Sequence, residues 1–271
     1  MKTIIALTNF STVADSAVSY AADMAAALQA QLIIMHVIQL PISFEVPLSE
    51  YECNAIQQDA GERLATLKAD LISRTGGVVN ISTKVITGTM LHEIEEVCDS
   101  KKPFLLVMGN ETRNWAERFV FGSNSFNTVK NLHYPVLVVP DGAIFKPINR
   151  VVLASDGYDV DEKPLEILKQ LLNAFHASVD IVHVNTGKYD KHKSTVTFQL
   201  IKHRFDEFKP HTLSINGNTV EDAIAHYAGH HSDDLIMVIA RKHNFLESVI
   251  HKSESNHIAR KPKIPVLAVA E

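Results

Sequence analysis

The stretch Leu32-Ile33-Ile34-Met35-His36-Val37-Ile38 is an apolar, mostly β-branched run bounded by more polar segments. Such a short continuous run is typical of a strand that is buried on both faces of a sheet. Similar runs recur along the chain, and segments with helical periodicity separate them. This alternation predicts a parallel sheet covered by helices on both faces. The predicted strands are 3–8, 32–38, 79–86, 104–108 and 135–139 in the first half, and 151–155, 179–184, 212–215, 235–239 and 265–270 in the second.

The two halves of the chain can be laid over one another. At an offset of 147, Ile34-Met35-His36-Val37 falls on Ile181-Val182-His183-Val184. At an offset of 130, Pro135-Val136-Leu137 falls on Pro265-Val266-Leu267. Because the second offset is smaller than the first, the first half has an extra segment, which we place in 39–48, where two prolines suit a surface loop. The repeat predicts two consecutive domains of the same fold.

The boundary between these domains is marked by Pro140, Gly142 and Pro147, which interrupt the pattern of strands and helices. We therefore expect domains at 1–142 and 148–271, and a length of 271 residues suits two domains. The predicted fold class is α/β, with two consecutive doubly wound, five-stranded parallel-sheet domains.

Composition and charge exclude several classes of protein. Hydrophobic residues make up 46% and charged residues 21% of the chain, which is the profile of a globular protein and not of a disordered or fibrous one. The net charge of −5 supplies no global positive field for nucleic acid or an anionic membrane. The two cysteines, Cys53 and Cys98, have no CxxC spacing, which favours a reducing compartment. The apolar opening ends at Thr8, too early for a signal peptide, so we expect a cytoplasmic protein.

Candidate ligand residues follow the predicted strands, because ligands of open parallel sheets bind beyond the carboxyl ends of the strands. Asn9 follows the first strand, Gly109 ends the fourth, and Gly122-Ser123 opens another apparent helix. Glycines let the backbone approach phosphates, to which backbone N–H groups and a serine hydroxyl donate. Two glycines are also compatible with an ordinary turn in which Ser123 caps a helix, and that alternative stays open.

Nearly the whole chain resembles a tandem universal stress protein. The resemblance rests on the opening 4–11, on the strand 32–37 that ends in His-Val, and on the segment from Met108-Gly109 to Pro140. The corresponding parts of the second half, 151–157, 181–184 and 235–270, carry it as well. The resemblance implies adenine-nucleotide alpha-hydrolase-like domains packed as an internal pseudo-dimer through their last strands. It also implies that two such chains can form a homodimer.

Nucleotide-binding members of this family have the pattern G-x-x-G, nine residues, then G-[ST], with an Asp after the first strand. Here the spacing between Gly109 and Gly122-Ser123 is kept, Thr112 replaces the second glycine, and Asn9 replaces the Asp. The resemblance implies an adenine nucleotide (ATP, ADP or AMP, with Mg²⁺) in the first domain. By the resemblance, backbone groups of Val37 contact the base, and the residues that meet ribose and phosphates are Gly109, Gly122, Ser123 and Ser125.

The second half departs from the pattern in the opposite way. It keeps an acidic residue, Asp156, after its first strand, but Ile239 and Lys252 stand where the first half has Gly109 and Gly122. Side chains at these positions obstruct a phosphate. We interpret the second site as degenerate.

The predicted function is that of a regulatory universal stress protein and not of a metabolic enzyme. We find no Walker lysine, catalytic triad or paired carboxylates by motif, so any ATP hydrolysis would be slow and incidental. The alternative is an interaction module in which both sites have lost the ability to bind nucleotide.

His226 and His230 have helical i, i+4 spacing, but no HExxH surrounds them, so we favour a solvated helix face over a zinc site.

Overall fold

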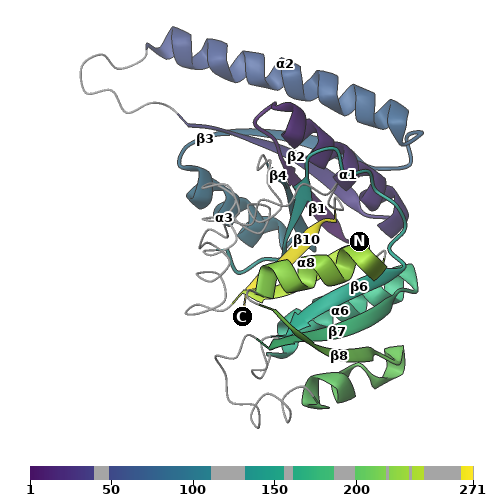
Figure 1. Ribbon diagram of the computed structural model, residues 1–271. Coiled ribbons are helices and arrows are strands. Elements are labelled where there is room, and N and C mark those ends of the chain that lie inside the picture. Colours follow the sequence, from purple (N-terminus) through teal and green to yellow (C-terminus); the bar gives the residue numbers. More distant parts are fainter. Residues whose placement is uncertain are drawn as a thin grey trace.

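The computed structural model describes residues 1–39, 49–110, 132–155, 161–185, 199–217, 220–231, 234–240 and 264–270. Its strands form a ten-stranded sheet in the order β3-β2-β1-β4-β5-β10-β9-β6-β7-β8 (Figure 1). The first half supplies β1 (Thr3–Leu7), β2 (Gln31–Ile38), β3 (Ile81–Thr87), β4 (Leu105–Asn110) and β5 (Val136–Pro140). The second half supplies β6 (Arg150–Ser155), β7 (Ser178–Asn185), β8 (His211–Asn216), β9 (Leu235–Ala240) and β10 (Val266–Ala270).

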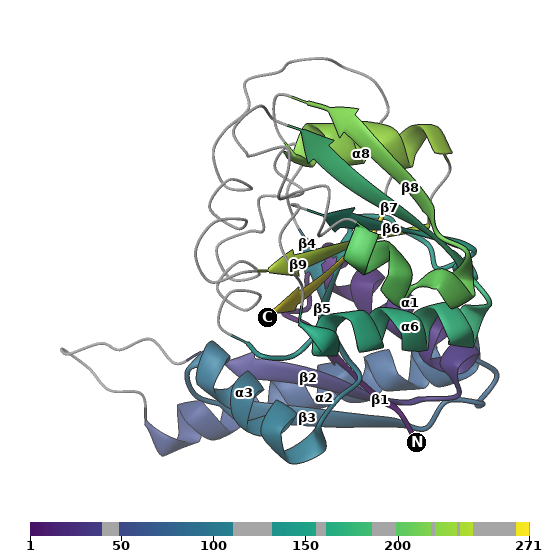
Figure 2. The same cartoon turned by 90° about the horizontal axis from the view of Figure 1, so that it is seen from below.

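The predicted fold class is confirmed. Every predicted strand is present, and its ends lie within two residues of the predicted ones. Within each half all the strand pairs are parallel. Figure 2 shows the first half, coloured from purple to teal, next to the second half, coloured from teal through green to yellow.

The strand register tests the internal repeat residue by residue. Ile4 of β1 pairs with Leu105 of β4, and their equivalents in the repeat, Val151 and Leu235, pair in the same way. The third strand differs. Ile33 pairs with Ser82, and the repeat therefore predicts that Asp180 pairs with Thr212, but its partner is His211. The register of β8 is thus shifted by one position from that of β3.

The two halves meet at an antiparallel pair of strands. Leu137 of β5 lies opposite Leu267 of β10, and Val136 and Val138 pair with Ala268 and Val266. These two apolar strands would otherwise be exposed edges, which are prone to pair with other chains. Their pairing makes both of them interior strands of one continuous sheet.

Helices cover both faces of the sheet, which explains why its strands are apolar on both sides. One buried cluster includes side chains of α1 (Thr12–Leu28), α2 (Glu50–Arg74) and α6 (Glu162–Phe175). The other includes side chains of α3 (Met90–Lys101) and α8 (Val220–His231). Figure 1 shows α2 and α3 on opposite sides of the first half. A 3-10 helix, η1 (Asp206–Phe208), precedes β8.

Helix α1 starts and stops at recognisable signals. The Ser11 hydroxyl accepts a hydrogen bond from the Ala14 N–H, as an N-cap should. The chain leaves the helix at Gln29, which adopts a left-handed conformation with φ of 51°. Small side chains line the buried face of the helix, so it can approach the sheet closely; they are Ala14, Ala17, Ala21, Ala22 and Ala25.

Helix α2 corrects the predicted position of the extra segment. The helix has 25 residues and begins with a capping box in which Ser49 and Glu52 bond each other's backbone N–H. In the second half, β7 ends at Asn185, and the helix equivalent to α2 ends at residue 204. The connecting loop and this helix together therefore occupy only the segment 186–204. Because α2 alone is longer than this whole segment, part of the extra length lies in α2 and not in the loop 39–48. Figure 1 shows the start of α2 reaching beyond the sheet.

The linker between the halves is packed against both of them. The Phe145 ring meets Tyr20 of α1 edge-on, with 5.2 Å between ring centroids, and lies 6.1 Å from Phe175 of α6. The Asp234 carboxylate, at the start of β9, accepts hydrogen bonds from the N–H groups of Asn149 at 2.7 Å and Arg150 at 3.2 Å. These contacts hold the middle of the linker and its end before β6.

Candidate functional site

The candidate site lies at the carboxyl ends of the first-half strands. β1 pairs with β2 on one side and with β4 on the other. The chain moves outward from β1 through β2 to β3 and then returns to the other side of β1 with β4. The strand order therefore reverses between β1 and β4, and this is where parallel α/β sheets leave a crevice for ligands.

Asn9 stands on the β1 side of this reversal point, directly after the strand, and its side chain is exposed. The Asn9 side-chain oxygen accepts a hydrogen bond from the Ser11 N–H at 3.0 Å. This Asx turn leads the chain into the N-cap of α1. What Asn9 offers outward is therefore its NH₂ group, a donor, whereas a carboxylate at this position would offer an acceptor.

Gly109 stands on the opposite side of the reversal point, near the end of β4. A β-carbon at this position would lie 2.8 Å from the Val13 carbonyl oxygen and 3.1 Å from the Val13 side chain. The absent side chain thus lets the strand end approach the first turn of α1. This contact explains the glycine by packing alone. Because Gly109 has no side chain, nothing from this residue stands between the β4 backbone and the N-terminus of α1.

Val37 lies in the part of β2 that extends beyond β1. The last paired residues of β1 and β2 are Leu7 and Met35, and Val37 pairs with Ile86 of β3 on the outer side. Its half-buried side chain packs with the cluster on the α3 face. The structure thus places Asn9, Val37 and Gly109 at the same edge of the sheet. The other predicted site residues lie outside the described residues; they are Thr112, Gly122, Ser123, Ser125 and Asp156.

A stack of side chains that the sequence did not predict supports the Asn9 loop. The Phe10 ring lies 4.4 Å from the His36 ring, and the Arg63 guanidinium of α2 lies 4.1 Å above Phe10. His36 Nδ1 donates to the Thr8 carbonyl at 2.8 Å. The only hint in the sequence was the position of an aromatic residue between Asn9 and Ser11.

Phe10 itself has an unusual backbone, with φ of 61°. This left-handed conformation is uncommon for a residue with a bulky side chain. The Phe10 N–H donates to the Thr8 hydroxyl at 2.9 Å, and the neighbouring Asx turn holds the next peptide. The loop between β1 and α1 is therefore fixed by its own side chains before any ligand binds.

In the second half, Ile239 occupies the position equivalent to Gly109, and its side chain is buried. A branched side chain therefore stands where the first half has no β-carbon. Lys252, the second departure, lies outside the described residues.

The histidine pair in α8 is explained by local contacts. The rings of His226 and His230 stack with centroids 4.1 Å apart, and His230 Nδ1 donates to the His226 carbonyl at 2.8 Å. Among the described residues, no group of three or more His, Cys, Asp or Glu side chains is placed to hold a metal ion.

The thiols differ in their surroundings. Cys98 is fully buried in α3, and burial, with smaller effects of the Asp99 and Glu95 charges, raises the pKa of its thiol to about 12. Cys53, in the first turn of α2, is partly exposed, and both cysteines are free. The buried thiol is thus kept protonated and unreactive.

The first half of the chain, which holds the candidate site, also decides the family. The model of the universal stress protein family matches residues 1–140, which is more than half of the chain. The chain belongs to the universal stress protein family. The match covers the first-half sheet and every described residue of the candidate site.

Two relatives carry the same family name. A universal stress protein of Methanocaldococcus jannaschii is 29% identical over 141 residues, which are 51% of this chain and 81% of the relative. A universal stress protein of Synechocystis is 25% identical over 225 residues, which are 82% of this chain and 76% of the relative. The second alignment extends across both halves of this universal stress protein.

A solved structure supports the complete fold. The crystal structure of a universal stress protein from Archaeoglobus fulgidus is similar over 99% of this chain and 98% of that chain, with a TM-score of 0.75 and 18% identity. At this identity the likeness concerns the fold alone. Within the described part of the chain, none of the helices has the length and hydropathy required to cross a membrane.

Proposed function

We propose that this universal stress protein is a regulatory protein that binds an adenine nucleotide in the crevice between the ends of β1 and β4. The observation that carries the proposal is the position of Asn9 and Gly109 on the two sides of the point where the strand order reverses. Gly109 matches the first glycine of the family's nucleotide-binding pattern, and Asn9 stands at the position of its Asp.

The described residues offer suitable groups for such a ligand. The NH₂ group of Asn9 is a donor for ring nitrogens of adenine or oxygens of ribose. Val37 lies where β2 extends past β1, so its backbone can border the base. Gly109 adds no side chain beside the N-terminus of α1, where the helix dipole favours negative charge. By resemblance, Gly122, Ser123 and Ser125 complete the phosphate contacts, with Mg²⁺ on the phosphates.

The first experiment is to purify the full chain without added nucleotide, denature it, and identify released small molecules by mass spectrometry. A thermal shift with ATP and Mg²⁺ accompanies it. We expect stoichiometric ATP, ADP or AMP, or stabilisation by ATP that reaches about 2.7 kcal/mol at a concentration of 100 times Kd. An empty protein with no shift would overturn the proposal.

Two variants locate the site. Gly122→Lys should abolish nucleotide binding, because the side chain and charge of lysine occupy the place of the glycine. Lys252→Ala, at the equivalent position of the second half, should leave binding unchanged. Equal affinity of the wild type and Gly122→Lys would remove the site from the first domain.

A second pair of variants isolates the contribution of Asn9. Asn9→Asp keeps an oxygen that can accept from the Ser11 N–H, so the turn is preserved while the outward donor is replaced by an acceptor. Asn9→Ala loses both the acceptor for the Ser11 N–H and the outward donor. If Asn9 contacts the nucleotide, Asn9→Asp changes nucleotide affinity without changing the melting temperature of the empty protein by more than a few degrees.

The alternative function is an interaction module without nucleotide. One observation favours it: the start of α2 lies beyond the sheet, and its Tyr51 side chain is 83% exposed. The same purification decides between the two functions, because only the interaction module would be empty and insensitive to ATP.

The two free cysteines support a reducing location, which we infer to be the cytoplasm.

We also infer that the halves, at 1–142 and 148–271, act as a pair joined through β5 and β10 in solution. Their antiparallel ladder and the packed linker support this. Limited proteolysis tests the boundary: cuts confined to 141–149 that leave the halves associated would agree with it. The predicted homodimer is tested by light scattering, which distinguishes a particle of 30.1 kDa from one of twice that mass.

A further inference from the structure

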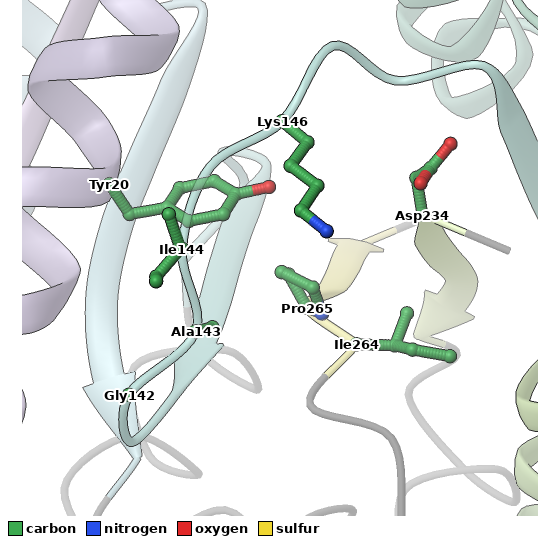
Figure 3. A pocket seen from close by; sticks show the side chains of 8 residues that line it. All are labelled: Tyr20, Gly142, Ala143, Ile144, Lys146, Asp234, Ile264 and Pro265. Carbon is green, nitrogen blue, oxygen red and sulfur yellow. The ribbon is translucent and has the colours of Figure 1, made fainter. Parts of the chain in front are cut away.

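A cavity of about 290 Å³ lies between the two halves, away from the carboxyl ends of β1 and β4. Its walls come from α1, from the linker after β5, and from the residues that precede β9 and β10. Three polar side chains face it: Tyr20, Lys146 and Asp234 (Figure 3). Ile144, Ile264 and Pro265 supply apolar surface.

Tyr20 is the unusual member of this set. Its side chain is only 4% exposed, yet among the residues that the structure describes its hydroxyl has no hydrogen-bond partner. A buried hydroxyl without a partner costs free energy, and most buried polar groups have one. Figure 3 shows this hydroxyl directed into the cavity. The other buried tyrosine of the described residues, Tyr227, has the expected partner, because its hydroxyl donates to Asp180 at 2.9 Å.

The charged groups of the cavity carry opposite signs. One Asp234 oxygen, Oδ2, accepts from the backbone of Asn149 and Arg150, which fixes the carboxylate and leaves Oδ1 with capacity to accept. Within the described part of the chain, Lys146 makes no ion pair with Asp234 or any other acid. Figure 3 shows its ammonium group in the space between Tyr20 and Asp234.

The Tyr20 hydroxyl remains a donor at neutral pH. Burial raises its pKa, and the nearby negative charge of Asp234 raises it further. The cavity therefore offers a neutral donor and a cation on one side, an anion on the other, and an apolar wall.

We propose that this cavity binds a small zwitterion of amino-acid size. Its carboxylate would accept from the Tyr20 hydroxyl and the Lys146 ammonium, its ammonium would donate to Asp234 Oδ1, and its side chain would contact Ile264 and Pro265. A zwitterion matches the opposite charges of Lys146 and Asp234. Asp234 would repel a plain anion, and Lys146 would repel a plain cation. The volume is at the lower limit for ligand pockets, which suits a ligand smaller than a nucleotide.

Such a ligand would contact both halves of the chain at once. Tyr20 belongs to the first half, Lys146 to the linker and Asp234 to the second half. Bound ligand would therefore stabilise the arrangement of the two halves. This site is independent of the proposed nucleotide site, so either can exist without the other.

The test uses the full chain and free L-amino acids, added singly at concentrations on the order of 10 mM, with binding followed by calorimetry and ligand-observed NMR. The N-acetylated and the C-amidated forms of each binder serve as matched ligands that lack one charge. We expect at least one free amino acid to bind, and both modified forms to bind about tenfold more weakly or worse, because each loses a charged hydrogen bond.

Variants connect the binding to the cavity. Tyr20→Phe removes only the hydroxyl and should weaken binding about three- to tenfold, and Lys146→Gln should weaken it about tenfold or more. The control variants make the same chemical changes elsewhere: Tyr227→Phe and Lys163→Gln should leave the affinity unchanged. A variant that unfolds is recognised by circular dichroism, and the ligand pairs still test the proposal in the wild type.

Three results would overturn the proposal. The first is that no free amino acid binds the wild type. The second is that an N-acetylated or amidated form binds as tightly as its parent, which would mean a plain anion or cation is the ligand. The third is wild-type affinity in both Tyr20→Phe and Lys146→Gln. None of these results depends on whether the protein carries a nucleotide.

Discussion

Gly109 at the end of β4 lies so close to Val13 in the first turn of α1 that a β-carbon on Gly109 would stand 2.8 Å from the Val13 carbonyl oxygen. Real β-carbons do not approach a backbone oxygen this closely, so a side chain would force the helix away from the strand. The position of α1 against the sheet therefore depends on the same glycine that opens the phosphate-binding pattern of the sequence.

Gly109→Ala should destabilise the protein by about 1–3 kcal/mol, because the added methyl group overpacks a contact made by backbone atoms. Urea unfolding measures the change. Gly61→Ala is the matched control: Gly61 lies inside α2 with nothing within 4 Å of the added carbon, so this variant should gain about 0.5–1 kcal/mol of helix stability. Equal effects of the two variants would contradict the close approach.

Tyr20 and Tyr227, the buried tyrosines of the described residues, should respond differently to loss of the hydroxyl. Tyr227→Phe leaves the buried Asp180 carboxylate without one of its hydrogen bonds and should cost about 1–3 kcal/mol. Tyr20→Phe removes a hydroxyl that has no partner among the described residues, so in the absence of ligand it should be neutral or slightly stabilising. Urea unfolding of both variants at pH 7 gives the comparison. A loss in Tyr20→Phe as large as in Tyr227→Phe would show that the Tyr20 hydroxyl is already bonded.

Burial of Cys98 predicts a loss of stability in alkali. Its pKa is raised from 9.0 to about 12 in the folded protein, so folding favours the protonated thiol. The contribution is fully present below pH 9 and is lost as the pH rises from 9 toward 12, because the unfolded chain releases this proton first. The expected slope is up to about 1.4 kcal/mol per pH unit. Unfolding by urea at several pH values measures it.

Cys98→Ala should make this pH dependence shallower, whatever its effect on stability at pH 7. Cys53→Ala, which removes a partly exposed thiol from the first turn of α2, is the control and should keep the wild-type slope. If the slopes of the two variants are the same, Cys98 does not carry the effect.

The start of α2 should fray in acid. The Ser49 hydroxyl and backbone N–H donate to Glu52 and lower the pKa of its carboxyl group. A lowered pKa means that this stabilisation is present above the usual glutamate range and is lost as the pH falls through the folded pKa. Hydrogen exchange at the Glu52 amide should therefore accelerate, relative to that of the middle of α2, as the pH falls. Ser49→Ala should show the faster exchange already at pH 7, and unchanged protection in that variant would argue against the capping box.

The sequence alone located the strands and the repeat of the two halves. Ten apolar runs located ten strands, and two offsets predicted that the halves repeat, because burial on both faces of a parallel sheet forces each strand to be continuously apolar. Periodicity does not determine the exact register of weakly apolar strands. β3 and β8 carry many exposed positions, and the strand pairing that the repeat predicts for β8 differs from the observed pairing by one residue.

Part of the candidate site follows from chain order. Asn9 and Gly109 lie at the ends of strands, and chain order places these strand ends at one edge of the sheet, whereas Val37 was implied by the family resemblance alone. That these residues bind a ligand stays a prediction. The Phe10, His36 and Arg63 stack was not found, because Arg63 comes from a helix whose rotation against the sheet depends on packing.

What the sequence determined by itself is the set of strands and their grouping into two similar halves, because these depend on local patterns of apolar residues; the family followed from its resemblance at particular residues such as Gly109. Only the tertiary structure decided that Leu137 lies opposite Leu267, that the Val13 carbonyl requires a glycine at position 109, and that Tyr20, Lys146 and Asp234 face one cavity. These relationships join residues that are far apart in the chain, and they arise from how the halves and helices pack, which no local pattern encodes.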